Sequence, residues 1–439
     1  MLNRENAEKI VEKISKNTEF YTTVNMVESD NGVTRFANSE ITQNVSISNT
    51  SVSITMYDGK KEASCSTNDV SSDGLKSLVK DAEALLAVVP EGEYEPFEIS
   101  SVSVVESIPD GKLADAFGIS QRAEIIKNGI RKAGEGFTAA GALNLDCTAL
   151  AIGDTKGAFR FTAFDKVSFN TVFTHTDGSA GAGKCCSYAG IPDIEAIFDT
   201  AAATATAARN PIGIDPGPYQ VVLSPGAFGT LIQFLTMMMG AESVEDGDSF
   251  AIGKIGERVF GENLTIIDDA TNPVLKPLLF DYEGTPRKTV SLIDKGVVRT
   301  CLYDNKLAFR HKTDNTGHAV SNKGRGGYPS NIIVEPGNKT IEELIGAVNS
   351  GVYINEFHYT NLVNPRQLQV TGLTRNGTFL IENGKITKPI TTMRFTVSLL
   401  ELFNEIIALS NDRTLIDSYF GASLVSAVSL DKFVFTSKQ

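Results

Sequence analysis

Two hydrophobic periods alternate along the first hundred residues, and each predicts a different kind of element. Apolar residues spaced three and four apart predict helices over 7–14 and 75–86. Alternation of apolar and polar residues predicts strands over 21–27 and 45–57, and Asp58-Gly59 then favours a tight turn. The pattern indicates one small α+β module, which ends in a segment rich in proline and glutamate.

The next hundred residues repeat the plan of this module. The expected elements are helices over 119–133 and 194–208, strands over 145–152 and 158–174, and a turn at Asp177-Gly178. Both units also contain a return strand of small residues that includes cysteine. The similarity favours a duplicated module, although any unit of helix, strands and helix gives a similar pattern. The two predicted modules span 1–98 and 99–210.

Strand patterns dominate after a segment between Asn210 and Pro218, whose three prolines are typical of a stiff linker. We place the start of a third domain, 211–439, in this linker. Residue pairs that adopt positive φ readily separate its strand-like runs and favour hairpin turns. These pairs are Lys295-Gly296, Asn376-Gly377 and Asn383-Gly384.

Two helices are expected among these strands. Thr340 with Glu343 and Ser398 with Glu401 have the spacing of a capping box, in which each side chain bonds the other residue's backbone amide. Apolar residues as far as Leu409 predict that the second helix is a core helix. The domain as a whole is predicted to be mainly antiparallel β.

The stretch 219–260 combines a short strand, a helix and a charged turn rich in glycine. Ser224 supplies an N-cap oxygen, and Pro225 suits the first helical position. Apolar side chains over 228–239 occupy every face of the helix, so we expect protein on all sides of it. The predicted fold class is α+β, with two small N-terminal modules and a larger, mainly antiparallel β domain that contains this buried central helix.

The order of motifs from this stretch onward resembles the TldD/PmbA family, whose members are also called modulators of DNA gyrase. The matching motifs are the strand, Ser-Pro, Gly and helix, then SFAIGKIGERVF, LTIIDDA, FDYEGTPRKTVSLIDKGVV, PSNIIVEPGNKTIEELI and TFLIENGKITKPI. An Asn-Thr-Gly at Asn315 and a Ser-Asn-Asp at Ser410 belong to the same series. Their shared order and spacing make an accidental similarity improbable.

This resemblance carries an expectation about zinc. TldD-type members are zinc peptidases whose central helix contains His-Glu-x-x-x-His, with a third ligand from a cysteine near the C-terminus. Counted from the shared Gly229, the three helix positions are Gln233, Phe234 and Met238 here, and no cysteine follows Cys301. A catalytic zinc needs about three nitrogen, sulfur or oxygen ligands and an open position for water. The resemblance therefore implies the PmbA/TldE branch, the metal-free partner of the peptidase.

The resemblance predicts a non-catalytic subunit that acts in proteolysis of peptides or small unfolded proteins. The expected partner is a TldD-type metallopeptidase subunit, or a second copy of this chain in a dimer. Zinc is expected only in a TldD-type partner, so this chain is assigned no cofactor, metal ligand or catalytic residue. The alternative is a self-sufficient hydrolase in the C-terminal domain, with an unrecognised cysteine–histidine pair or a non-standard metal site.

The polar, glycine-rich segment 309–331 has the composition of a functional or mobile loop. The resemblance also places a substrate channel near its end. Candidate contacts for the carboxylate or backbone of a peptide are His311, His318, Lys323, Arg325, Tyr328 and Asn331. A solvated loop without any ligand is the alternative interpretation.

Composition restricts the location and the partners of the chain. Its 439 residues carry a formal net charge of −13, which disfavours binding to the phosphate backbone of nucleic acids. The five cysteines, an odd number, do not suggest a disulfide framework. No apolar run approaches the ~18 residues of a membrane span, and the charged N-terminus is unlike a signal peptide. We expect a cytoplasmic protein that binds neither nucleic acid nor membrane.

Overall fold

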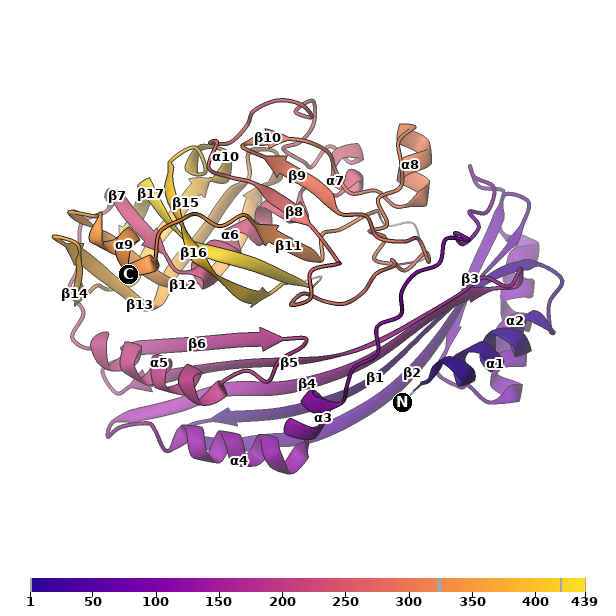
Figure 1. The fold of residues 1–439 in the computed structure, drawn as a ribbon, viewed down its shortest axis with the longest axis horizontal. Helices are drawn as coiled ribbons and strands as arrows, with labels where there is room; N and C mark the ends of the chain where they lie inside the picture. The colour runs from indigo at the N-terminus through magenta and orange to yellow at the C-terminus, as the bar shows by residue number, and fades with distance from the viewer. Residues whose placement is uncertain (1, 322–325, 419–420, 439) are drawn as a thin grey trace.

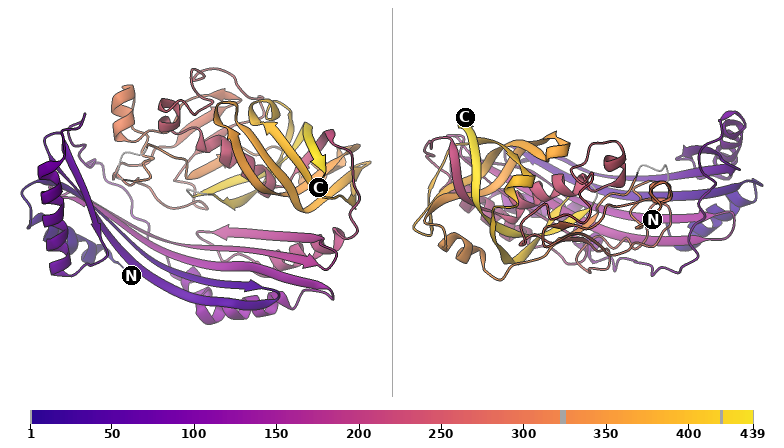
Figure 2. Two further views of the ribbon diagram at one scale, coloured as in Figure 1. Left: turned by 180° about the vertical axis from the view of Figure 1, so that it is seen from behind. Right: turned by 90° about the horizontal axis from the view of Figure 1, so that it is seen from above.

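A computed structural model describes residues 2–321, 326–418 and 421–438 (Figure 1). In these residues, the N-terminal half forms a long curved sheet, and the C-terminal half forms a larger sheet that lies over its concave side (Figures 1 and 2). The fold is therefore α+β, with two N-terminal modules followed by a larger, mainly β domain. This confirms the predicted fold class.

The two N-terminal modules share a single sheet with the strand order β3-β2-β1-β4-β5-β6, antiparallel throughout. The first module contributes α1 (Arg4–Ser15), β1 (Tyr21–Ala37), β2 (Glu40–Asp58), β3 (Lys61–Thr67) and α2 (Ser72–Val88). The second contributes α3 (Lys112–Ala116), α4 (Ile119–Ile130), β4 (Phe137–Asp154), β5 (Phe159–His175), β6 (Ala180–Ser187) and α5 (Ile194–Ala207). Because β1 pairs with β4 at the centre, the modules join edge to edge.

The strands of this sheet are longer than the hydrophobic pattern predicts, since β1 has 17 residues and β2 has 19. Residues 28–31 in the middle of β1 are only partly buried or exposed, so apolar alternation is not required there. The helices cover the convex face at the two ends of the sheet (Figure 2). That arrangement leaves the concave face for the C-terminal domain.

In the C-terminal domain, described strands follow the order β10-β9-β8-β11-β17-β15-β13-β12-β7, with β14 beside β13 and β16 beside β17. The strands are β7 (Gly217–Leu223), β8 (Ile266–Asp268), β9 (Val290–Asp294), β10 (Val297–Val298), β11 (Asn331–Val334), β12 (Ser350–Asn364), β13 (Gln369–Glu382), β14 (Lys385–Pro389), β15 (Met393–Ser398), β16 (Ile406–Asp417) and β17 (Ala422–Lys438). The helices are α6 (Pro225–Met237), α7 (Ala241–Glu245), α8 (Asn305–His311), α9 (Ile341–Gly346) and α10 (Leu399–Leu402), with a 3-10 turn, η1, at Pro365–Gln367. β17 also pairs with β7, which closes part of the sheet into a ring beside α6.

The structure confirms some of the turns and helix caps predicted for this domain and contradicts others. Lys295-Gly296 and Asn383-Gly384 form the predicted hairpin turns with positive φ, and Thr340 forms the full capping box of α9. Asn376-Gly377 also has positive φ, but it lies inside β13. The predicted core helix through Leu409 is wrong, because α10 ends at Leu402 and the chain then pairs with β17 as strand β16.

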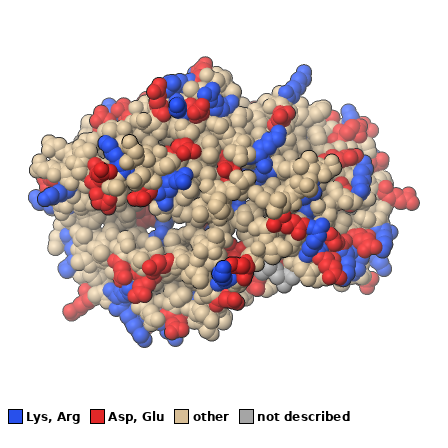
Figure 3. Space-filling view, in the orientation of Figure 1, with Lys and Arg blue, Asp and Glu red and all other residues tan. Residues whose placement is uncertain are grey.

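Acidic and basic side chains are intermingled on the face that Figure 3 shows, and hollows run along the boundary between the two sheets. Among the described residues, no helix combines the length and apolar character needed to cross a membrane.

Candidate functional site

Helix α6 begins at the predicted cap. The Ser224 hydroxyl accepts a hydrogen bond from the Ala227 amide at 3.1 Å and donates one to the Asn355 carbonyl at 2.5 Å, which ties the helix to β12. The apolar pattern predicted protein on every side of the helix. The structure buries it in its domain except along one face, which is only half-buried. The half-buried residues are Pro225, Gly226, Thr230, Gln233, Phe234 and Met237, followed by the C-cap residue Met238.

The three positions that correspond to the zinc motif all lie on this half-buried face. Gln233 borders a pocket of about 10 Å³, room for about one water molecule, whereas Phe234 and Met238 pack against the main core. An amide, a phenyl ring and a thioether are not a set of zinc ligands. In the described part of the chain, no group of three or more His, Cys, Asp or Glu is arranged to hold a metal ion. The residues at these positions therefore do not fit zinc.

A buried polar network occupies the end of the segment that was predicted to bind peptide. The Asp268 carboxylate accepts hydrogen bonds from Arg287 Nη2 at 2.6 Å and from the amides of Ser330 and Asn331 at 2.8 and 3.2 Å. His318 Nε2 lies 3.2 Å from the same carboxylate, and its side chain is fully buried. His318 and Asn331 are therefore engaged inside the domain.

The charge state of this network follows from burial and from its neighbours. Burial alone would raise the pKa of Asp268, but the nearby Arg287 and His318 hold it well below its ordinary value. Burial lowers the pKa of His318, and Arg287 adds to that effect, while Asp268 opposes it. The His318 ring faces two acceptors, the Asp268 carboxylate and the Thr316 carbonyl at 2.9 Å from Nδ1. A neutral ring can donate to only one of them.

Two further candidates from the segment meet acidic residues of α7. His311, at the end of α8, has Nε2 3.1 Å from a carboxylate oxygen of Glu245. The Tyr328 hydroxyl donates to Glu242 at 3.1 Å. Both side chains therefore flank α7. Lys323 and Arg325 lie outside the described residues.

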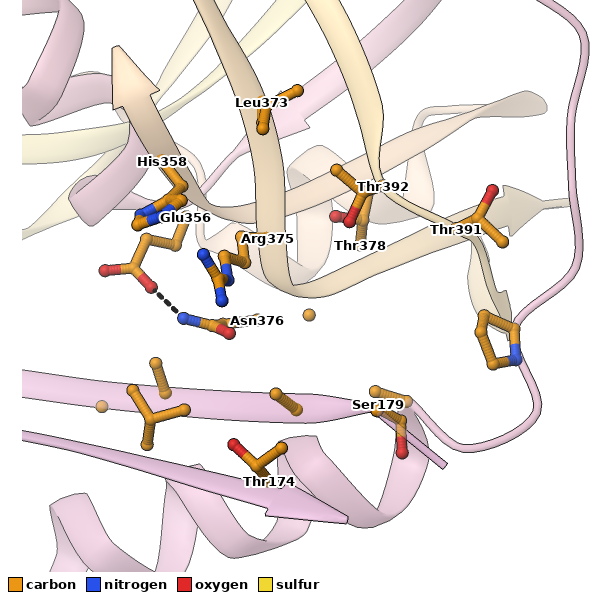
Figure 4. A pocket seen from close by; sticks show the side chains of 18 of the residues that line it. Thr174, Ser179, Glu356, His358, Leu373, Arg375, Asn376, Thr378, Thr391 and Thr392 are labelled. Atoms are coloured by element: carbon orange, nitrogen blue, oxygen red, sulfur yellow. Dashed lines mark hydrogen bonds between the residues drawn. The ribbon is translucent and has the colours of Figure 1, made fainter. Parts of the chain in front are cut away.

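A cavity of about 780 Å³ lies between the second N-terminal module and the C-terminal domain (Figure 4). Its floor is one face of β5 and β6, where cross-strand neighbours project together. These neighbours are Asn170 with Lys184, Val172 with Ala182, and Thr174 with Ala180. The opposite face packs on α5, since a Cβ on Gly183 would lie 2.7 Å from an Ile197 methyl. The two small alanines leave the floor hollow.

The roof of this interdomain cavity belongs to β12 and β13. Glu356 lies opposite Arg375 in the strand register, and His358 lies opposite Leu373. Asn376 Nδ2 donates to the Glu356 carboxylate at 2.7 Å, as the dashed line in Figure 4 shows. The other Glu356 oxygen is 3.8 Å from Lys184 Nζ, so one weak ion pair joins the roof to the floor.

Sequence reasoning did not find this cavity, because its two walls come from domains far apart in the chain. One available signal was the Asn376-Gly377 pair, which was interpreted as a hairpin turn. Gly377 has φ +117°, and a Cβ there would lie 2.7 Å from a Thr204 methyl, so the position needs glycine. Another was the run of small residues over 180–183 in β6. Neither signal identifies its partner across the domains.

The environment of the five cysteines disfavours the thiolate form. All five are free, and burial raises the pKa of each thiol. The pKa reaches about 12 for Cys147, Cys186 and Cys301, and about 11 for Cys185. A nucleophilic cysteine requires the opposite shift, because the thiolate is the reactive form.

Comparison with known families matches two parts of the chain. Residues 216–437 match the PmbA/TldA metallopeptidase C-terminal domain, and residues 24–86 match PmbA/TldA metallopeptidase domain 1. An uncharacterised protein of Methanocaldococcus jannaschii is 36% identical over 199 residues, or 44% of this chain and 45% of that protein. A protein of Methanothermobacter thermautotrophicus named metalloprotease is 26% identical over 212 residues, which are 47% of this chain and 46% of that protein. The chain thus spans about half the length of the curated relatives it matches.

Solved structures extend the similarity to the whole chain. TldE from Thermococcus kodakarensis superposes with a TM-score of 0.85 at 18% identity, over 98% of this chain and 99% of that one. A putative modulator of a DNA gyrase from Thermotoga maritima also superposes with a TM-score of 0.85. The two proteins are 20% identical, and the match covers 99% of this chain and 100% of that one. At these identities the similarity shows that the fold is shared.

Proposed function

This chain belongs to the TldD/PmbA metallopeptidase family, and from that premise we propose that it is a PmbA/TldE-like subunit without catalytic zinc. The observation that carries the proposal is the face of α6 at the motif positions. Gln233, Phe234 and Met238 supply no set of zinc ligands there, and two of them pack against the core. Such a subunit acts together with a TldD-type zinc peptidase in the proteolysis of peptides or small unfolded proteins.

Metal analysis tests this proposal directly. The purified chain should contain far less than one zinc per molecule and should not cleave unfolded peptides by itself. Cleavage should appear when a TldD-type subunit is added, and a chelator should abolish it. About one zinc per chain, together with chelator-sensitive cleavage by the chain alone, would contradict the proposal.

We also propose that the C-terminal domain, taken as 211–439, forms a dimer interface with a TldD-type subunit or with a second copy. The two N-terminal units, 1–98 and 99–210, then lie outside the interface. A stable interface buries more than ~1,000 Å². Light scattering at micromolar concentration should detect a dimer, either of the chain alone or with the partner. A monomer under both conditions would reject the interface.

The alternative of a self-sufficient cysteine hydrolase receives no support from the site. Burial raises the pKa of the five thiols, which opposes formation of the thiolate at neutral pH. His311 and Tyr328, which lie beside α7, stay candidates for contact with a peptide. Substituting either with alanine should weaken peptide binding if they contact the substrate.

A further inference from the structure

We propose that the interdomain cavity binds the C-terminal end of an extended peptide, and that Arg375 holds the terminal carboxylate. The choice of a peptide as ligand rests on the proposed function, whereas the position and polarity of the site rest on the cavity itself. The volume of about 780 Å³ lies within the ~300–1,000 Å³ of typical ligand pockets.

Among the described residues that line this cavity, Arg375 is a cation without an ion-pair partner. Its side chain is exposed, and within the described parts of the chain no carboxylate lies within ion-pair distance of it. Glu356 is its neighbour across the strands, but that carboxylate binds Asn376 and approaches Lys184 instead. Figure 4 shows the Arg375 guanidinium directed into the space between the two walls. A planar guanidinium with free N–H groups suits bidentate binding of a carboxylate.

Asn376 supplies an unused acceptor beside this cation. Its Oδ1 is buried and has no hydrogen-bond partner among the described residues, although Nδ2 is fixed by Glu356. The backbone is held as well, because Asn355 Nδ2 donates to the Asn376 carbonyl at 2.9 Å. Buried acceptors without partners are rare in native proteins. A small turn of the Asn376 side chain toward the cavity would offer this acceptor to the N–H of a peptide's last residue, next to a carboxylate bound by Arg375.

The rest of the cavity suits a backbone more than a particular side chain. Hydroxyl groups, which both donate and accept, line its walls at Thr174, Thr378, Thr391 and Thr392 (Figure 4). Burial, with help from Arg375, lowers the pKa of His358, so a neutral imidazole faces the ligand at pH 7. The remaining charged groups, Lys184 and Asp177, already approach Glu356 and His175. The expected ligand is a short peptide with a free carboxylate and little sequence preference.

Fluorescence anisotropy of the purified full chain tests the inference. The probes are a hexapeptide of mixed sequence, labelled at its N-terminus, with either a free or an amidated C-terminus. The free acid should bind roughly tenfold more tightly, the scale of a charge-assisted hydrogen-bond pair. Arg375→Gln should lower binding of the acid to the level of the amide, and Arg375→Lys should retain part of the difference.

Arg413→Gln is the matched control, because Arg413 is an exposed arginine of β16 that does not line the cavity. It should leave both affinities unchanged, and the melting temperatures of all variants should agree. Equal binding of acid and amide, an equal loss in Arg413→Gln, or no binding of either peptide at roughly millimolar concentration would overturn the inference.

These outcomes are separable from failure of the proposed function. A chain that contains zinc and cleaves alone, yet still needs Arg375 to distinguish acid from amide, keeps the site and rejects the non-catalytic role. A zinc-free chain that activates a partner, but binds acid and amide equally, keeps the role and rejects the site.

Discussion

Asp268 and Asp294 each bind an arginine at 2.6 Å, but the side chains of the first pair are 0% and 3% exposed, and those of the second 41% and 48%. Asp268→Asn should therefore lower the free energy of unfolding by about 3–5 kcal/mol, because Arg287 stays buried without its counter-charge. Urea unfolding at pH 7 measures this loss.

Asp294→Asn is the control, since an exposed pair of the same length is worth about 1 kcal/mol or less. The folded-state pKa of Asp268 is depressed, so its contribution is present above the ordinary value of 3.8 and is lost as pH falls through the folded pKa. Equal losses for the two variants at pH 7 would show that burial does not set the strength of these pairs.

Glu283 is expected to affect stability with the opposite pH dependence to Asp268. Burial, and then Asp281 and Asp304, raise the pKa of Glu283 well above its ordinary value of 4.5. The folded state then binds more protons than the unfolded state, so Glu283 costs stability as pH rises above 4.5. Glu283→Gln should be more stable than the natural chain at pH 8, by about 1.4 kcal/mol for each unit of raised pKa, and equally stable near pH 4.

Glu95 and Glu283 line another pocket, of about 40 Å³, which is separate from the one beside Gln233. Glu95 is exposed, which makes Glu95→Gln a matched control. This variant should show the same pH dependence of melting as the natural chain. The interpretation fails if Glu283→Gln loses stability at pH 8, because the hydrogen bond from the Asn305 amide to Glu283 would then outweigh the cost of the charge.

The sequence predicted single residues correctly where the partner is local. Ser224 and Thr340 cap helices through amides three residues ahead, and their spacing is visible in the sequence. His318 and Asn331 were interpreted as peptide contacts, although their partners are Asp268 and Arg287, far away in the chain. Polar residues in a glycine-rich segment do not reveal whether their partner is a ligand or a buried charge.

Elements show the same dependence on distant partners. The apolar spacing after Ser398 fits a helix, but Ile406 and Leu409 become part of β16 because that strand pairs with β17 and buries them. Strands β1 and β2 exceed their predicted lengths for a related reason, since neighbouring strands pair with their polar middle residues. Helix α6 was predicted correctly because cap, proline and apolar run all agree.

The half-buried face of α6 predicts what restoring the zinc motif would do. Combining Gln233→His, Phe234→Glu and Met238→His should lower the melting temperature, since the last two side chains pack against the core. A buried polar group without a partner costs about 1–3 kcal/mol, and a charge costs more. Zinc should recover little of this loss, and no peptide cleavage should appear, because no cysteine follows Cys301 to act as third ligand.

Gln233→His alone is the control for this experiment. Gln233 borders the small pocket with Ser418 and Ser423, so an imidazole should change stability by no more than about 0.5 kcal/mol. Calorimetry with and without zinc compares the variants. If zinc restored both stability and cleavage in the triple variant, a third ligand would already be present in the fold.

At the scale of the whole molecule, the sequence could predict the modules but not how they join. The alternation of apolar and polar residues and the turn residues can be recognised within each segment, so both N-terminal units could be predicted from the sequence. The pairing of β1 with β4, and the cavity between β6 and β13, depend on surfaces that meet only after folding. Ion pairs such as Lys166 with Asp417 and Lys306 with Glu62 cross the same boundary. Contacts of this kind have no local signature.

Apolar contacts at this boundary predict that the two sheets unfold together. Phe280 and Leu278 of the C-terminal domain pack with Leu150 and Ile152 of β4, and Phe280 is 1% exposed. Phe280→Ala should cost about 3–5 kcal/mol, as for other buried phenylalanines, and should keep a single calorimetric transition at a lower temperature. Phe20→Ala, at a partly exposed position of the first module, should move the transition little. Separate transitions, with hydrogen exchange in β1 and β4 unchanged by Phe280→Ala, would mean that the N-terminal sheet is stable without the C-terminal domain.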